Sequence, residues 1–300
     1  MEVHNYDLSA RRMRVAFERP ERRHFIEARM GGGTLMQGAD VAEVPLQHMA
    51  RDNFLGVPVD CLTLAQTIAL IDHAIRSRRP VQHVCINVAK FVAMRTNDEL
   101  DRDVRSSDLI NIDGMGIVWA ARLLGVKVPE RVSGIDLMEK LIQLCAVNRY
   151  RPYFLGATPE VLQASISNFR RRFVGLELAG SQHGYFAKNQ EREIVCRIKA
   201  SEADCLFIGM PTPHKERLLA RFRDDFGVPF IMGVGGAFDV FAGWIHRAPR
   251  ALQNVGLEWL FRTVQEPLRL GPRYVKTNAA FAKIVSKAIA ARLFSDKVIS

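Results

Sequence analysis

Downstream of residue 54, short apolar runs alternate with longer segments in which apolar residues recur on one helical face. The runs predict buried strands and the amphipathic segments predict helices. The predicted strands are 83–87, 108–112, 151–156, 176–180, 204–209 and 229–235. The predicted helices lie near 64–78, 90–103, 115–124, 136–148, 158–172, 187–200 and 214–226. This alternation predicts an α/β fold with a mostly parallel, doubly wound sheet flanked by helices.

The two ends of the chain differ from this middle part. Residues 1–50 are rich in arginine and have no sustained period, which predicts a disordered extension, or a start codon misassigned upstream of a later Met. Residues 51–245 form the predicted core domain. Residues 246–300 are predicted to form a basic, amphipathic helical appendage.

Composition excludes several classes of protein. Of the 300 residues 48% are hydrophobic, an ordinary value for a globular protein, but no apolar stretch reaches the roughly 18–20 residues of a membrane span. The N-terminus has no apolar signal region. The five cysteines are scattered and without CxxC spacing, which indicates a reducing cytoplasm and neither a zinc site nor a disulfide framework.

Positive charge is concentrated at the C-terminus. The net charge is +10, and residues 242–300 hold ten Lys and Arg against three acidic residues. A basic segment of this kind indicates an anionic partner: phosphate groups, a membrane surface or nucleic acid. A basic amphipathic helix is typical of proteins that lie on anionic membranes, but a terminal helix packed on its own domain has the same pattern. Nucleic acid is disfavoured because interleaved aromatic residues and known binding motifs are missing.

Candidate chemistry gathers where the predicted strands end. Ligands of doubly wound sheets bind beyond the carboxyl ends of the strands. Glycine there lets backbone approach a ligand, and a following helix N-terminus offers free N–H groups to phosphate. The same glycines also serve as plain turn residues. The candidates at these ends are Asn87, Asp113, Gly114, Gly156, Gly209, Gly233 and Gly235.

Asp113 allows two interpretations. It follows the apolar run 109–112 and precedes Gly114, so it could cap the next helix. It could also act as a general base, if burial raises its pKa and a substrate hydroxyl lies within hydrogen-bond reach. Lys215 and Glu216, after a pair of prolines, could likewise face a diphosphate at the edge of the sheet or simply face solvent.

Known cofactor and metal motifs are incomplete. Neither Gly114-Met115-Gly116 nor Gly233-Val234-Gly235 continues to the third glycine of a dinucleotide site, and there is no P-loop. Asp101 and Asp103 resemble the Asp-x-Asp of metal-dependent sugar transferases, but they lie in a charged helical segment without a preceding strand. The eight histidines show no ligand spacing. We therefore predict neither a metal nor a cofactor.

Four segments together resemble one family. They are NIDGMGIVWAARLLG, PERVSGIDL, FIGMPTPHKE and GVGGAFDVFAGWIHRAPRALQNVGLEWLFRTVQEPLRL. These segments are similar to the WecG/TagA/CpsF glycosyltransferases, glycosyltransferase family 26, over about residues 55–274. The resemblance implies a Rossmann-like, metal-independent bacterial enzyme that is peripheral to the inner face of the cytoplasmic membrane. It also implies transfer of a hexose, N-acetylhexosamine or its uronic acid from a UDP-sugar to a sugar on a polyprenyl diphosphate. The products would be exopolysaccharide, teichoic acid or common antigen.

The resemblance also assigns residues. The family's proposed base maps onto Asp113, which implies a single displacement that inverts the anomeric centre. Substrate-binding positions map onto Asn87 and Arg131. The arginines of the appendage, thought to complete the active site on the membrane, map onto Arg262, Arg269 and Arg273.

Two positions depart from the family pattern. Cys85 stands where a threonine is common, and Lys215 stands where the family has glutamine, so the donor sugar stays open. The departures leave an alternative function, a non-catalytic scaffold at the membrane that binds lipid-linked sugar. Association of several copies of the chain stays open as well.

Overall fold

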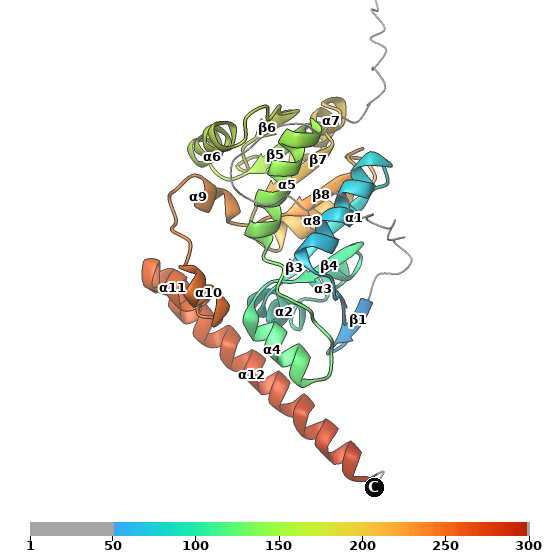
Figure 1. The fold of residues 1–300 in the computed structure, drawn as a ribbon, viewed down its shortest axis with the longest axis vertical. Coiled ribbons are helices and arrows are strands. Elements are labelled where there is room, and N and C mark those ends of the chain that lie inside the picture. Colours follow the sequence, from blue (N-terminus) through green and yellow to red (C-terminus); the bar gives the residue numbers. More distant parts are fainter. Residues whose placement is uncertain (1–50, 299–300) are drawn as a thin grey trace, which may run out of the picture. The chain divides into compact units, whose positions relative to one another are not determined.

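The computed structural model describes residues 51–298, apart from the side chains of Arg269 and of residues 293–298. Its centre is a six-stranded sheet with the order β4-β3-β8-β7-β5-β6 (Figure 1), and every neighbouring pair is parallel. The strands are β3 (Val81–Ile86), β4 (Leu109–Ile112), β5 (Pro152–Gly156), β6 (Gly180–Gln182), β7 (Cys205–Gly209) and β8 (Phe230–Gly233). The prediction for residues 1–50 concerns a part of the chain outside the described residues.

Helices connect the strands and cover both faces of the sheet. The helices of the core are α1 (Leu64–Arg76), α2 (Val88–Met94), α3 (Asp98–Arg105), α4 (Met115–Leu123), α5 (Gly134–Asn148), α6 (Pro159–Arg172), α7 (Glu191–Ala200), α8 (His214–Phe222) and α9 (Ala237–Phe241). A short 3-10 helix, η2 (Lys188–Gln190), precedes α7. The predicted α/β fold with a parallel sheet is confirmed.

Alternate residues of the central strands enter different layers of the core. Phe154 and Phe207 pack with α1, α5, α6 and α9 on one face. Leu155 and Ile208, one position further along β5 and β7, pack with α7 and α8 on the other face. Strands that are buried on both faces are apolar throughout, which is why their sequences are continuous hydrophobic runs.

A small hairpin was missed by the sequence analysis. β1 (Arg51–Phe54) and β2 (Val57–Asp60) pair in antiparallel fashion beside β4. The buried carboxylate of Asp60 accepts hydrogen bonds from the guanidinium of Arg51 at 2.8 Å and from the backbone N–H of Ile110 at 2.6 Å. The hairpin is thereby fixed to the edge of the sheet.

Two predicted elements were wrong in position or extent. Residues 176–179 are not a strand; Leu176 is a buried loop residue, and β6 begins only at Gly180, where pairing with β5 starts. The predicted helix 90–103 is two helices, because Asn97 caps the start of α3 by accepting a hydrogen bond from the N–H of Leu100 at 3.0 Å.

The appendage consists of α10 (Arg250–Asn254), α11 (Glu258–Gln265) and the long α12 (Pro267–Val298) (Figure 1). Phe281 of α12 is buried, with its ring 6.4 Å from Phe54 and 5.7 Å from Phe91, and Ile284 and Val285 pack beside it. These apolar side chains of α12 therefore pack on the protein's own core and not on a membrane. None of the helices within residues 51–298 is both long enough and apolar enough to cross a bilayer.

Candidate active site

Asp113 lies at the carboxyl end of β4, beside the end of β3. Its backbone N–H donates to the carbonyl of Ile86 at 2.8 Å, which continues the parallel ladder by one step. Gly114 begins α4 with a φ of 123°, a conformation that favours glycine, and makes no side-chain cap. The Asp113 carboxylate instead accepts a hydrogen bond from the N–H of Gly134, at the start of α5, at 3.1 Å. Asp113 is therefore not the cap of its own helix.

Burial dominates the electrostatics of Asp113. Removal from water raises the pKa of the carboxyl above its ordinary value, and the negative charge of Glu258 raises it further. The positive charges of Arg131 and Arg262 and the hydrogen bond from Gly134 act in the opposite direction. A carboxylate with a raised pKa is a stronger base than an exposed aspartate, and this property suits proton abstraction from a hydroxyl group.

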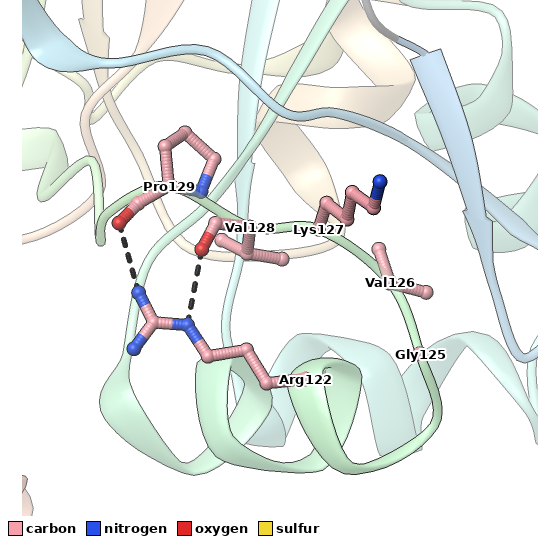
Figure 2. Close-up of a pocket in the computed structure, with 6 residues that line it drawn as sticks. All are labelled: Arg122, Gly125, Val126, Lys127, Val128 and Pro129. Carbon is pink, nitrogen blue, oxygen red and sulfur yellow. Dashed lines mark hydrogen bonds between the residues drawn. The ribbon is translucent and has the colours of Figure 1, made fainter.

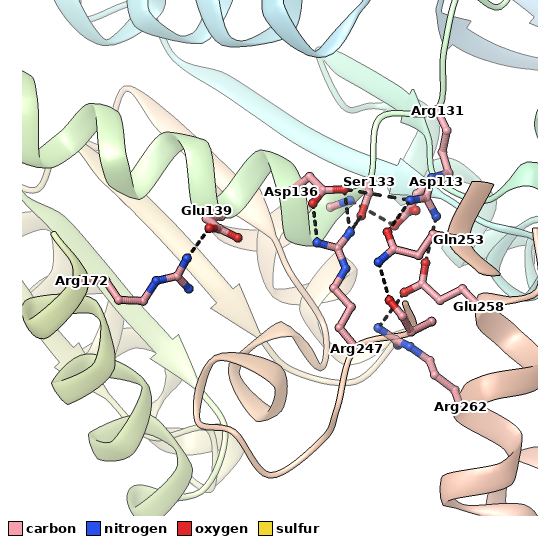
Figure 3. A network of polar contacts seen from close by, with 12 residues as sticks. Asp113, Arg131, Ser133, Asp136, Glu139, Arg172, Arg247, Gln253, Glu258 and Arg262 are labelled. Atoms are coloured by element: carbon pink, nitrogen blue, oxygen red, sulfur yellow. Dashed lines mark hydrogen bonds and ion pairs between the residues drawn. The ribbon is translucent and has the colours of Figure 1, made fainter. Parts of the chain in front are cut away.

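Arg131 connects the core to the appendage next to Asp113 (Figure 3). Its guanidinium contacts Glu258 of α11 at 2.9 Å and the side-chain oxygen of Gln253 at 3.2 Å. Glu258 also pairs with Arg262 at 3.5 Å, and the amide of Gln253 donates to the carbonyl of Ala248 at 2.7 Å. The predicted residues Asp113, Arg131 and Arg262 are thus brought together.

A second arginine of the appendage, Arg247, was missed by the sequence analysis. Its guanidinium forms a bidentate pair with Asp136 at the start of α5, with one contact of 2.6 Å, and reaches Ser133 at 3.4 Å (Figure 3). Bidentate pairs of this geometry are directional and comparatively strong. The contact fixes the connection between α9 and α10 against the helix whose N-terminus binds Asp113.

The segment that precedes Arg131 is braced from α4. Arg122 donates to the carbonyls of Val128 at 3.0 Å and Pro129 at 2.8 Å (Figure 2). These bonds shape a shallow, open pocket lined by Arg122, Gly125, Val126, Lys127, Val128 and Pro129. Through these bonds Arg122 holds the segment that leads to Arg131.

Three charged side chains are buried together at the carboxyl ends of β3 and β7. One carboxylate oxygen of Glu216 contacts the ammonium groups of Lys90 at 2.9 Å and Lys215 at 2.8 Å. Lys215 also donates to the hydroxyl of Thr212 at 2.5 Å. Each of the three charged side chains is less than a tenth exposed. With two positive charges and one negative, the cluster carries a net positive charge.

The pKa values of this cluster reflect burial and mutual charge. Burial lowers the pKa of Lys215 to about 8, and the charges of Lys90 and Arg273 add to that effect, whereas Glu216 opposes it. For Glu216, burial raises the pKa, but the two lysines outweigh it and bring the value to about 2. Lys215 and Glu216 therefore stay ionised near pH 7. Among the charges that lower the pKa of Lys215, that of Arg273 comes from α12.

Cys85 lies on β3, the strand that pairs with the one Asp113 follows. Burial raises the pKa of its thiol and Asp113 raises it further, whereas Lys90 and Lys215 lower it. A β-carbon on Gly134 would lie 3.5 Å from both the Cys85 sulfur and the Asp113 carboxylate. Asp113 and the lysine cluster thus lie at the same end of the sheet, where the strands have their carboxyl ends.

Of the remaining predicted residues, Gly233 and Asn87 adjoin the lysines, whereas Gly156 and Gly235 have other surroundings. Gly233 adjoins the alkyl chain of Lys215, since a β-carbon there would approach it to 3.2 Å, and Asn87 caps α2 by accepting from the N–H of Lys90 at 2.9 Å. Gly156 serves packing, because a β-carbon there would lie 2.3 Å from the carbonyl of Gly209. Gly235 has no neighbour within 4 Å of such a carbon. The side chain of Arg269 is outside the described part of the structure.

Lys90 and Glu258 were missed because nothing local marks them. Each lies on an ordinary amphipathic helix, and only the sheet order and the docked appendage place them at the site. Asp101 pairs with Arg105 and Asp103 with Arg217, as expected of a charged helical face. Within residues 51–298 no group of three or more His, Cys, Asp or Glu side chains is arranged to hold a metal ion.

Comparison with known proteins identifies the family. A model of the glycosyl transferase WecG/TagA/CpsF family matches residues 52–294. An N-acetylglucosaminyldiphosphoundecaprenol N-acetyl-beta-D-mannosaminyltransferase of Bacillus spizizenii is 34% identical over 179 residues, which cover 60% of this chain and 68% of that protein. The chain belongs to the WecG/TagA/CpsF family and is a glycosyltransferase.

Proposed function

We propose that this enzyme transfers a sugar from a UDP-sugar to a sugar carried on a polyprenyl diphosphate, with inversion at the anomeric carbon. The similarity to a transferase whose name specifies an N-acetylglucosaminyl-diphosphoundecaprenol acceptor supports the acceptor class. That name also makes UDP-N-acetylmannosamine the first donor to test. Because Lys215 stands where the family has glutamine, the donor sugar stays open and the other UDP-sugars are tested as well.

Asp113 is the proposed general base. Its carboxylate accepts the proton of the acceptor hydroxyl while the oxygen attacks the anomeric carbon. The new glycosidic bond forms as the bond from that carbon to the β-phosphate oxygen breaks, and UDP leaves. Burial and the neighbouring Glu258 support this assignment, because both strengthen Asp113 as a base.

Side-chain cations stabilise the departing diphosphate in this proposal. Lys90 and Lys215 supply the net positive charge at the edge of the sheet, and Arg262 and Arg273 supply charge from the appendage. Fixed cations in a partly dehydrated site stabilise developing negative charge effectively. We therefore expect turnover without an added divalent cation. The observation that carries the proposal is that Asp113 and the lysines Lys90 and Lys215 lie at the same carboxyl-terminal end of the parallel strands.

The direct test is UDP release from a panel of UDP-sugars, with a short-chain prenyl-diphosphate-GlcNAc acceptor and EDTA present. We expect one donor to support release that depends on the acceptor. UDP binding without release across the whole panel would favour the alternative, a scaffold that binds lipid-linked sugar.

Replacing Arg273 tests the cations of the appendage. We expect Arg273→Ala to lower kcat about 10- to 100-fold, because one cation near the diphosphate is lost. Lys287→Ala, an exposed change on the same helix, is the matched control and should leave kcat with the short-chain acceptor unchanged. Equal rates for Arg273→Ala and wild type would remove Arg273 from the site.

The appendage also carries the proposed membrane contact, on the inner face of the cytoplasmic membrane. Apolar side chains are exposed there beside the basic residues of α12, including Trp259, Leu260, Val264, Leu268 and Val275. Exposed apolar side chains beside basic residues favour binding to an anionic bilayer surface.

We expect Val264→Glu/Leu268→Glu to abolish co-sedimentation with phosphatidylglycerol vesicles while thermal unfolding stays the same. These side chains are 74% and 94% exposed. Val174→Glu, at an equally exposed position in the core, is the control and should keep binding. Retained vesicle binding by the double variant would show that another surface makes the contact.

A further inference from the structure

Glu258 is the acidic residue of the appendage that contacts Arg131 beside Asp113. It begins α11 and lies 127 residues after Arg131, whose guanidinium it contacts at 2.9 Å through one carboxylate oxygen. Its other oxygen lies 3.5 Å from the guanidinium of Arg262, one helical turn further along α11. The side chain is only 17% exposed, so these contacts are partly shielded from water.

The charges of both arginines held by Glu258 act on the proposed base. Arg131 and Arg262 both stabilise the ionised form of Asp113, whereas Glu258 disfavours it. The other charged or titratable groups around Asp113 are Arg247, paired with Asp136, and the thiol of Cys85. Without Glu258, Arg131 would keep its longer carboxylate contact of 4.0 Å with Asp136 but lose the shorter one, and Arg262 would lose its pairing with Glu258.

We propose that Glu258 is a positioning residue of the active site: by holding Arg131 and Arg262 at its two carboxylate oxygens, it makes the docking of α11 set the charge environment of Asp113. The inference rests on the proposed function in that it takes Asp113 as the base. It adds that α11 contributes more than cations to the site. The docked helix keeps two arginines from over-stabilising the carboxylate that must accept a proton.

The first test is independent of activity. In protein labelled with carboxyl-¹³C aspartate, the Asp113 resonance is the one missing from Asp113→Asn, and its titration is followed by NMR. We expect the titration midpoint to move to lower pH in Glu258→Gln, because the negative charge is lost while the size of the side chain is kept. Glu258→Asp keeps the charge and should titrate close to wild type. Glu139→Gln, which breaks the Arg172 pair on the core surface, is the matched control.

The second test is the pH dependence of UDP release. Glu258→Gln should lower kcat about 10-fold and move the acidic limb of kcat/KM to lower pH, in the same direction as the NMR midpoint. A merely structural role would raise KM and lower kcat without moving either midpoint, and that result overturns the inference. Failure of the proposed function is distinguishable, because it leaves wild type without turnover whatever the NMR titration shows.

Discussion

Asp113→Asn is expected to lower kcat by about 10³-fold while the protein stays folded and still binds UDP. Asparagine keeps the shape of the side chain and can still accept the hydrogen bond from Gly134, but it cannot take a proton from the acceptor hydroxyl. Loss of a general base costs about 10²- to 10⁴-fold. UDP release with saturating donor and acceptor measures the change.

The pH profile of wild type belongs to the same prediction. Because burial raises the pKa of Asp113, activity should decline as pH falls through a value above that of an ordinary aspartate. The control for Asp113→Asn is a substitution at an exposed residue. Asn111 does not qualify, since it is buried and bonded to His83. Glu99→Gln, at an exposed side chain, is suitable. Wild-type turnover in folded Asp113→Asn would refute the role of Asp113.

Glu216→Gln is expected to reduce the free energy of unfolding by about 3–5 kcal/mol. The substitution leaves the ammonium groups of Lys90 and Lys215 buried side by side without a counter-charge. Removing one partner of a buried ion pair has an effect of this size, because the remaining charge is neither solvated nor neutralised. Urea denaturation at pH 7 measures the change.

Two comparisons sharpen this prediction. Lys215→Gln leaves one lysine and one glutamate, so it should lose far less stability than Glu216→Gln. The folded-state pKa of Glu216 is about 2 against an ordinary 4.5, so the unfolded chain binds the proton more readily. Its stabilising effect is therefore present above about pH 4.5 and is lost as pH falls toward 2, a dependence that should be absent in Glu216→Gln. Equal stability of wild type and Glu216→Gln would contradict the buried cluster.

The sequence allowed prediction of the features that are local. Strands buried on both faces are continuous apolar runs, so β3, β4, β5, β7 and β8 were found within two residues at each end. Asp113 stood out because a carboxylate directly follows such a strand and precedes a glycine. The region 176–180 failed for the same reason, since Leu176 and Leu178 are apolar but pack from a loop.

The rest of the site depends on contacts between distant residues. Lys90 and Glu216 come from helices after β3 and β7, and β8 lies between those two strands in the sheet. Glu258 and Arg247 reach the site only because the appendage packs against the start of α5. A single sequence carries no signal for such pairings. Asp113 was predictable from its place after a strand, and Arg131 and Arg262 from the family resemblance, but Glu258 and Arg247 were not.

The measurement that tests the account most directly is the structure of the product. The enzyme is incubated with the active UDP-sugar and the prenyl-diphosphate-GlcNAc acceptor, and the lipid product is analysed by mass spectrometry and by NMR of the new anomeric carbon. The account predicts a lipid-linked disaccharide in which the α-configured donor sugar has become β-linked. An α-linked product, or free sugar in place of a disaccharide, would contradict a single displacement with Asp113 as the base.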